Sequence, residues 1–162
     1  DLANRVFELH IEQFLKFVET DLELKPGAIE VLEALKAAGF PLAIATSTAR
    51  VRALPRLERF DMLKCFDSIT CGDEIENGKP APDIFVESAR RLGCDPALCA
   101  VIEDSHNGVR SGHASGARVF MIPDIVAPTP EIEEMCTAVL STLHELPAAI
   151  AAANDSPAPR RA

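Results

Sequence analysis

The sequence predicts an α/β fold built on a doubly wound parallel sheet. Short apolar runs alternate along the chain with longer segments of helical spacing, and this alternation is typical of a parallel sheet with helices on both faces. Polar residues follow three of these runs, directly or in the next loop, and open α/β sheets bind their ligands at that edge. We therefore expect the functional site at the carboxyl ends of the strands.

Composition narrows the class of protein. The 162 residues are 48% hydrophobic and 25% charged, as in a soluble globular domain. The net charge of −9, with no basic cluster, argues against nucleic-acid binding. Five cysteines without CxxC spacing favour a reduced, cytoplasmic setting over disulfides or a zinc site. No apolar run is long enough for a membrane span, and we expect no membrane association.

The first part of the chain predicts two helices and a strand. Residues 1–19 carry apolar side chains at the spacing of an amphipathic helix. A second helix is expected to begin after Pro26 and Gly27 and to end at Gly39. Residues 41–46 are an apolar run followed by a polar turn, the pattern of a buried strand.

The middle of the chain continues the alternation. Residues 49–60 have helical spacing, although Pro55 predicts a kink or a break. Residues 68–71 predict a strand that runs into a polar loop. Residues 82–92 carry an apolar stripe at helical spacing, and Gly93 is expected to end that helix.

The stretch from Cys99 to Gly116 contains the clearest strand and helix signals. Cys99–Glu103 predicts a buried strand, and Ser105 is a good N-cap for the helix that follows. Gly108 and Gly112 lie four residues apart, so they share one face of that helix and allow a close approach to the sheet.

The last elements are shorter. Residues 118–122 predict a strand, 138–140 a short edge strand and 143–153 a final helix. The remaining residues, 153–162, read as a disordered tail.

The polar residues that follow the three predicted strands suit one kind of chemistry. Thr46 supplies a hydroxyl that can bond an anionic oxygen, Lys79 a fixed cation, and Glu103 with Asp104 a carboxylate pair that can hold Mg2+. Taken singly, a threonine at a strand end is often a helix cap and a loop lysine is often merely solvated. Together they predict a site for a phosphoryl group.

Four motifs then identify a family resemblance. They are PGAIEVLEALKAAGFPLAIATST at 26–48, GKPAPDIF at 78–85, IEDSHNGVRSGHASG at 102–116 and LSTLHEL at 140–146. The set resembles the haloacid dehalogenase (HAD) superfamily of phosphohydrolases, in the branch of phosphoglycolate phosphatases and β-phosphoglucomutases. This resemblance implies a Rossmann-like core over residues 21–152, with residues 1–20 as the remnant of a helical cap.

The resemblance also implies roles for residues at the first strand end. Thr46 matches the threonine whose hydroxyl bonds the transferring phosphoryl group, with the backbone amide of Ser47 nearby. Arg50 follows the same turn and is a further candidate for substrate binding.

The resemblance assigns the remaining charged residues to catalysis and metal binding. Lys79 matches the lysine that neutralises the charge of the nucleophile and the phosphoryl group. Glu103 and Asp104 match the pair that holds Mg2+ directly or through water, and Ser105 supports them. Charge neutralisation of this kind is the main requirement of phosphoryl transfer.

One family motif is absent. DxDGT, which supplies the aspartate nucleophile on the central strand, occurs nowhere in the 162 residues. We therefore expect an N-terminally truncated core that lacks its first, central strand and leaves two strand edges unpaired.

The resemblance implies a Mg2+-dependent phosphatase acting on a small phosphorylated metabolite, such as a sugar phosphate or phosphoglycolate, through a phospho-aspartyl intermediate. One alternative is a β-phosphoglucomutase-type phosphotransferase, and another is an inactive remnant that binds phosphate or a partner. The 162-residue chain by itself is expected to be inactive. Substrate identity and oligomeric state stay open.

Overall fold

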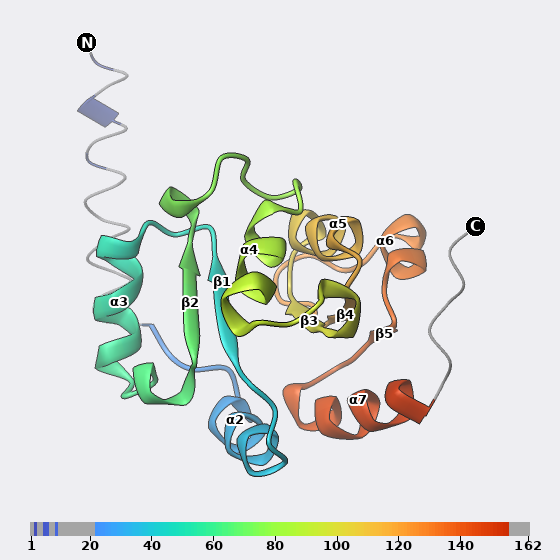
Figure 1. Cartoon of the computed structure of the whole chain (residues 1–162). Helices are drawn as coiled ribbons and strands as arrows, with labels where there is room; N and C mark the ends of the chain where they lie inside the picture. The colour runs from blue at the N-terminus through green and yellow to red at the C-terminus, as the bar shows by residue number, and fades with distance from the viewer. Residues whose placement is uncertain (1, 3–4, 7–8, 10–21, 156–162) are drawn as a thin grey trace.

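The computed structural model describes residues 22–155 and, among the first ten, residues 2, 5, 6 and 9. This part of the chain forms parallel strands and surrounding helices (Figure 1). The strands are β1 (Ala43–Thr46), β2 (Ser68–Cys71), β3 (Ala100–Glu103), β4 (Arg118–Met121) and β5 (Ala138–Val139). The predicted α/β class with parallel strands is confirmed. The expected cap remnant at 1–20 and the tail beyond Asp155 lie almost entirely outside the described residues.

The strands form two sheets, in the orders β1-β2 and β3-β4-β5, and every pairing is parallel. Thr46 lies opposite Cys71 in the first sheet, and Glu103 lies opposite Met121 in the second. Both pairs are at the carboxyl ends of their strands. The predicted site residues Thr46 and Glu103 therefore end β1 and β3.

Most helices begin and end where the sequence predicts. The longer ones are α2 (Ala28–Ala37), α3 (Arg50–Arg59), α4 (Asp83–Leu92), α5 (His106–Ser115) and α7 (Leu146–Asp155). Single 3-10 turns are η1 (Leu63–Cys65), η2 (Gly72–Glu74), η3 (Pro96–Leu98) and η4 (Leu143–Glu145). Ser105 caps α5 by accepting a hydrogen bond from the Gly108 N–H, as expected of an N-cap serine.

Three helices differ from the expectation. Pro55 does not divide α3, because that helix lies at the surface, where water can satisfy the carbonyl that a proline leaves without a donor. A further helix, α6 (Pro130–Met135), was not expected. Its signals are a threonine N-cap, Thr129, and proline at the first helical position. Helix α7 runs to Asp155, into the segment read as a tail.

The core lies in two layers on opposite faces of the strands. One apolar cluster joins α2 and α7 to the sheet, and the other joins α4, α5 and α6 to it (Figure 1). Gly112 allows α5 to sit close to the second sheet, because a Cβ there would lie 2.9 Å from Val101 and 3.0 Å from Val119. The expected close approach of this helix is thus observed.

The two sheets leave a gap between β1 and β3. Within the described chain β1 pairs only with β2, and β3 pairs only with β4 on one side, so neither inner edge has a strand partner. A largely apolar cavity of about 470 Å3 lies between them. Its lining includes Ala43 of β1, Val101 of β3, Phe85 of α4 and Leu146 of α7. This gap runs up to the carboxyl edge where the predicted site lies.

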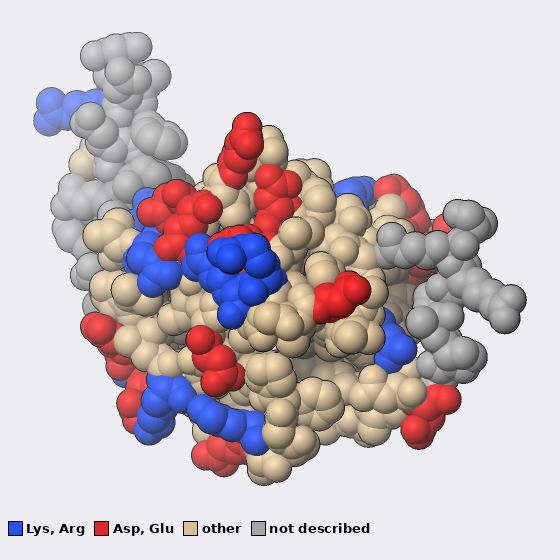
Figure 2. Space-filling model, viewed as in Figure 1, with Lys and Arg blue, Asp and Glu red and all other residues tan. Residues whose placement is uncertain are grey.

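The cysteines and the surface complete the picture. All five cysteines are free, and Cys71 is the only buried one. None of the helices in the described ranges combines the length and hydrophobicity needed to cross a bilayer. On the face seen in Figure 2, basic side chains lie beside acidic ones and form no extended basic surface.

Candidate active site

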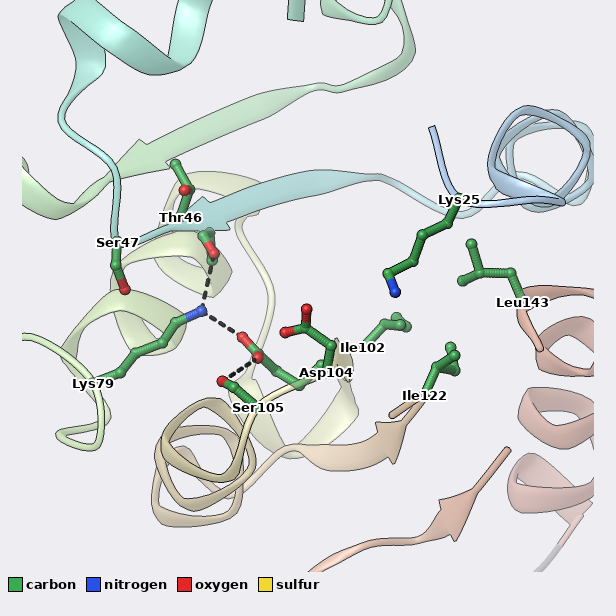
Figure 3. A pocket seen from close by; sticks show the side chains of 11 residues that line it. Lys25, Thr46, Ser47, Lys79, Ile102, Asp104, Ser105, Ile122 and Leu143 are labelled. Atoms are coloured by element: carbon green, nitrogen blue, oxygen red, sulfur yellow. Dashed lines mark hydrogen bonds and ion pairs between the residues drawn. The ribbon is translucent and has the colours of Figure 1, made fainter. Parts of the chain in front are cut away.

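A cavity of about 420 Å3 opens at the carboxyl ends of β1 and β3. Five of the six predicted site residues line it, namely Thr46, Ser47, Lys79, Glu103 and Asp104. They come from three places in the sequence: the end of β1, the loop between β2 and α4, and the end of β3 (Figure 3). The fold therefore gathers residues that lie up to 58 positions apart into one site.

Lys79 lines this cavity and is held there by three contacts. Its ammonium group forms an ion pair with Glu103 and donates a hydrogen bond to the carbonyl oxygen of Ala45 at 3.2 Å. The ring of Phe85 lies 4.8 Å below the same nitrogen. The side chains of Lys79 and Glu103 are only 12% and 8% exposed, so their mutual attraction is weakly screened by water. A positive charge is thus fixed between β1 and β3.

Glu103 is positioned by the helix that follows it. The Ser105 hydroxyl donates to Oε2 of Glu103 at 3.1 Å and accepts from the Gly108 N–H at 3.1 Å. A Cβ at residue 108 would lie 1.8 Å from the same Oε2. Only glycine leaves room for the carboxylate, and this explains the glycine three residues after the serine.

Asp104 differs from its neighbour in being exposed. In Figure 3 its carboxylate points into the cavity. The donor set suits Mg2+, which takes carboxylate oxygens, keeps several waters and needs few protein ligands. No group of three or more His, Cys, Asp or Glu side chains suited to a metal occurs in the described part of the chain. The two carboxylates of Glu103 and Asp104 fit an ion of this kind, which would complete its shell with water and substrate oxygens.

Thr46 and Ser47 form the wall opposite Glu103. The Thr46 hydroxyl accepts a hydrogen bond from the Thr48 N–H at 3.1 Å. It therefore stabilises the turn after β1, which is a structural role. A hydroxyl that accepts one bond still has its own hydrogen to donate. Thr46 can therefore support the turn and bind an anionic oxygen at once.

Arg50 is not among the residues that line the cavity. Its guanidinium forms an ion pair with Glu74 and donates to the Ile69 carbonyl oxygen at 2.8 Å. Arg91 bonds the same carbonyl and the same carboxylate, each at 2.8 Å. The hydrogen bond from Arg50 is the largest cause that lowers the pKa of Glu74 to about 2, against the opposing effect of burial. The observed contacts of Arg50 are thus structural, along the outer edge of β2.

One residue at the cavity was not predicted. Lys25 lies on the wall formed with Ile122 and Leu143, and its side chain points inward in Figure 3. Its ammonium group pairs with Asp124 at 2.8 Å. No motif marks Lys25, which stands just before the Pro26–Gly27 helix start, so only the three-dimensional arrangement could reveal it.

The end of β1, the loop after β2 and the end of β3 thus bring a hydroxyl, a lysine and two carboxylates to one cavity. The chain belongs to the haloacid dehalogenase-like hydrolases, because the sequence pattern that defines this family matches residues 2–116.

Individual relatives agree with this assignment. Protein CbbY of Rhodobacter capsulatus is 33% identical over 88% of this chain and 69% of its own length. A phosphorylated carbohydrates phosphatase of Thermotoga maritima is 40% identical, with 71% and 53% covered. The crystal structure of CbbY from Rhodobacter sphaeroides with phosphate superposes with a TM-score of 0.73 at 31% identity, covering 83% of this chain and 61% of that one. The chain thus matches only part of the length of several relatives.

Proposed function

We propose that this chain carries most of the active site of a Mg2+-dependent phosphatase for small phosphomonoesters, such as sugar phosphates or phosphoglycolate. The observation that carries the proposal is the convergence of Thr46, Lys79, Glu103 and Asp104 on one cavity. Hydrolysis of a phosphate ester requires that negative charge on the phosphoryl oxygens be neutralised. A buried lysine and a carboxylate pair suited to Mg2+ meet that requirement.

Each residue has a distinct part in this proposal. The Thr46 hydroxyl and the Ser47 N–H donate to phosphoryl oxygens. Lys79 neutralises charge on the phosphoryl group and the nucleophile. Glu103 and Asp104 would hold Mg2+, directly or through water, and the metal would supply further charge neutralisation. The relatives whose names refer to phosphorylated carbohydrates and phosphoglycolate support the substrate class.

The nucleophile is proposed to come from sequence outside these 162 residues. No DxDGT motif is present, and the gap between β1 and β3 is where a strand carrying it would lie. The supporting features are two unpaired inner edges and the apolar cavity between them. Ser88, which lines that cavity, has a buried hydroxyl that finds no hydrogen-bond partner among the described residues. A strand in the gap would pair with the free backbone groups of β1 and β3 and would place polar groups within reach of the Ser88 hydroxyl.

The outer edge of β2 is closed, in contrast to the inner edges. Arg50 and Arg91 both donate to the Ile69 carbonyl oxygen, and Glu74 accepts from the Cys71 N–H at 3.1 Å. Backbone groups of an edge strand that are already bonded cannot recruit another strand. This contrast favours the inner gap as the place for the missing segment.

A second function is favoured for the 162-residue chain taken alone. Because it contains no DxDGT aspartate, we infer that it binds phosphate and Mg2+ without turnover. For the longer protein, a β-phosphoglucomutase-type phosphotransferase is the alternative to the phosphatase, because the family resemblance covers both activities.

Hydrolysis assays test this proposal. The 162-residue chain and the same chain with its upstream coding sequence are assayed with Mg2+ on p-nitrophenyl phosphate, phosphoglycolate and sugar phosphates. The longer protein is expected to hydrolyse at least one of them and the Asp104→Asn variant to lose that activity. Hydrolysis by the 162-residue chain that Asp104→Asn abolishes would contradict the assignment of the nucleophile to missing sequence.

A further inference from the structure

The two partners of the central ion pair come from different elements. Lys79 lies in the loop between η2 and α4, and Glu103 ends β3, 24 residues later. A loop and a strand end have no backbone pairing that fixes one against the other here. A third element can set their separation, and α5 contacts both the loop and β3.

Ser111 is the point where α5 contacts the loop. Its side chain is fully buried, with 0% exposure. The hydroxyl donates a hydrogen bond of 2.6 Å to the carbonyl oxygen of Ala81, which lies 30 residues earlier and two residues after Lys79. The hydrogen bond ties the half-buried loop at Ala81 to a fully buried point on α5, and removing the hydroxyl would take away the hydrogen-bond donor of that carbonyl.

The same face of α5 also holds Glu103. Gly108 makes room for the carboxylate and, through Ser105, orients it. Residues 108 and 111 are three apart, so they lie on one side of the helix, one above the other. One helix face therefore positions the acid through Gly108 and the loop of the lysine through Ser111.

We propose that Ser111 is a positioning residue, which sets the loop so that the Lys79 ammonium group lies between Ala45 and Glu103. The inference rests on the proposed function only in giving Lys79 a role in the site. Its structural content, the placement of Lys79 by a hydroxyl on α5, can be measured without any enzymatic activity.

The test is the reactivity of Lys79 toward an amine reagent. The folded 162-residue chain is treated with trace acetic anhydride, and the acetylation of each lysine is measured by peptide mass spectrometry. Lys25, on another wall of the same cavity, and Lys64, at 70% exposure, serve as references within each molecule. Ser115→Ala is the matched control, because the Ser115 hydroxyl bonds the Gly112 carbonyl of its own helix at 2.7 Å.

Ser111→Ala is expected to raise acetylation of Lys79, relative to Lys25 and Lys64, on the order of tenfold. Ser115→Ala should leave that ratio unchanged, even if both variants lose similar stability. An unchanged ratio in folded Ser111→Ala, or an equal rise in Ser115→Ala, would overturn the inference.

A second variant covers the case in which Ser111→Ala does not fold. Ser111→Cys keeps the shape of the side chain, with a slightly larger atom in place of the oxygen, but the thiol donates weakly, and an intermediate rise in the Lys79 ratio is expected. An unchanged ratio in folded Ser111→Cys would count against the inference. Failure of the longer protein to hydrolyse any phosphate ester would overturn the proposed function and leave the acetylation ratio to decide the role of Ser111.

Discussion

Lys79 and Glu103 form an ion pair that joins the loop after β2 to the end of β3, across the gap between the two sheets. The side chains are 12% and 8% exposed. Lys79 also donates to the Ala45 carbonyl of β1, so a single ammonium group contacts both inner strands. This pair both connects the two halves of the sheet and places a positive charge in the candidate active site.

Removing one partner of this pair is expected to cost more than removing both. Lys79→Met should lower the free energy of unfolding by about 3 kcal/mol, because it leaves a nearly buried carboxylate without its cation. The double variant Lys79→Met/Glu103→Gln should recover more than half of that loss. Urea unfolding followed by circular dichroism measures both. Lys64→Met, which removes an exposed pair with Asp61, is the control and should cost about 0.5 kcal/mol or less. If the double variant loses as much stability as the two single variants Lys79→Met and Glu103→Gln lose together, the coupling between Lys79 and Glu103 is contradicted.

Glu74 is expected to make stability depend on pH in acid. Its pKa is about 2 in the folded chain, chiefly through the hydrogen bond from Arg50, against an ordinary value of 4.5. A carboxyl group whose pKa is lower in the folded than in the unfolded chain stabilises the folded chain at pH values above the unfolded pKa. This stabilisation is lost as the pH falls from about 4.5 toward 2. Glu74→Gln should therefore lower stability at pH 7 by about 1–2 kcal/mol and flatten the pH dependence below pH 4.5.

Unfolding midpoints between pH 2.5 and pH 7 check this expectation. The exposed residue Glu76, two positions along, gives the control variant Glu76→Gln, which should follow the parent chain. Equal acid sensitivity of Glu74→Gln and the parent would show that Glu74 does not carry this dependence.

Gly108 is expected to tolerate no side chain. A Cβ there would lie 1.8 Å from the Glu103 carboxylate, so Gly108→Ala must displace Glu103 or shift α5. We expect a loss of about 2 kcal/mol, although alanine is otherwise the better helix former by about 1 kcal/mol. Gly78→Ala is the control, because a Cβ at Gly78 would meet nothing within 4 Å. Thermal unfolding that places Gly108→Ala at or above the parent would contradict the close contact.

The sequence predicted the strand ends well and side-chain partners poorly. Thr46 and Glu103 could be placed because each ends an apolar run before a polar turn, which is local information. Arg50 is a candidate for substrate binding from its nearness to Thr46, whereas the partners that the structure gives it, Ile69 and Glu74, lie 19 and 24 residues away. Such long-range partners carry no local signal.

Other differences have equally physical causes. The signals of α6, the Thr129 cap and Pro130, are present in the sequence, but the helix spans only six residues and hydrophobic periodicity is weak over so short a segment. Lys25 lines the cavity and forms an ion pair with Asp124, which lies 99 residues away. Sequence patterns therefore predict the secondary-structure elements and the reactive residues, whereas tertiary packing decides which charged side chains face the cavity.

Binding of phosphate to the 162-residue chain, followed by 31P NMR with and without Mg2+, tests the central claim most directly. The claim is that Thr46, Lys79, Glu103 and Asp104 form one site for a phosphoryl group and Mg2+. The account predicts saturable phosphate binding that Mg2+ strengthens, with the strengthening lost in Asp104→Asn and kept in the control Asp124→Asn. Phosphate binding that ignores Mg2+, or that responds to Mg2+ equally in Asp104→Asn, would contradict it.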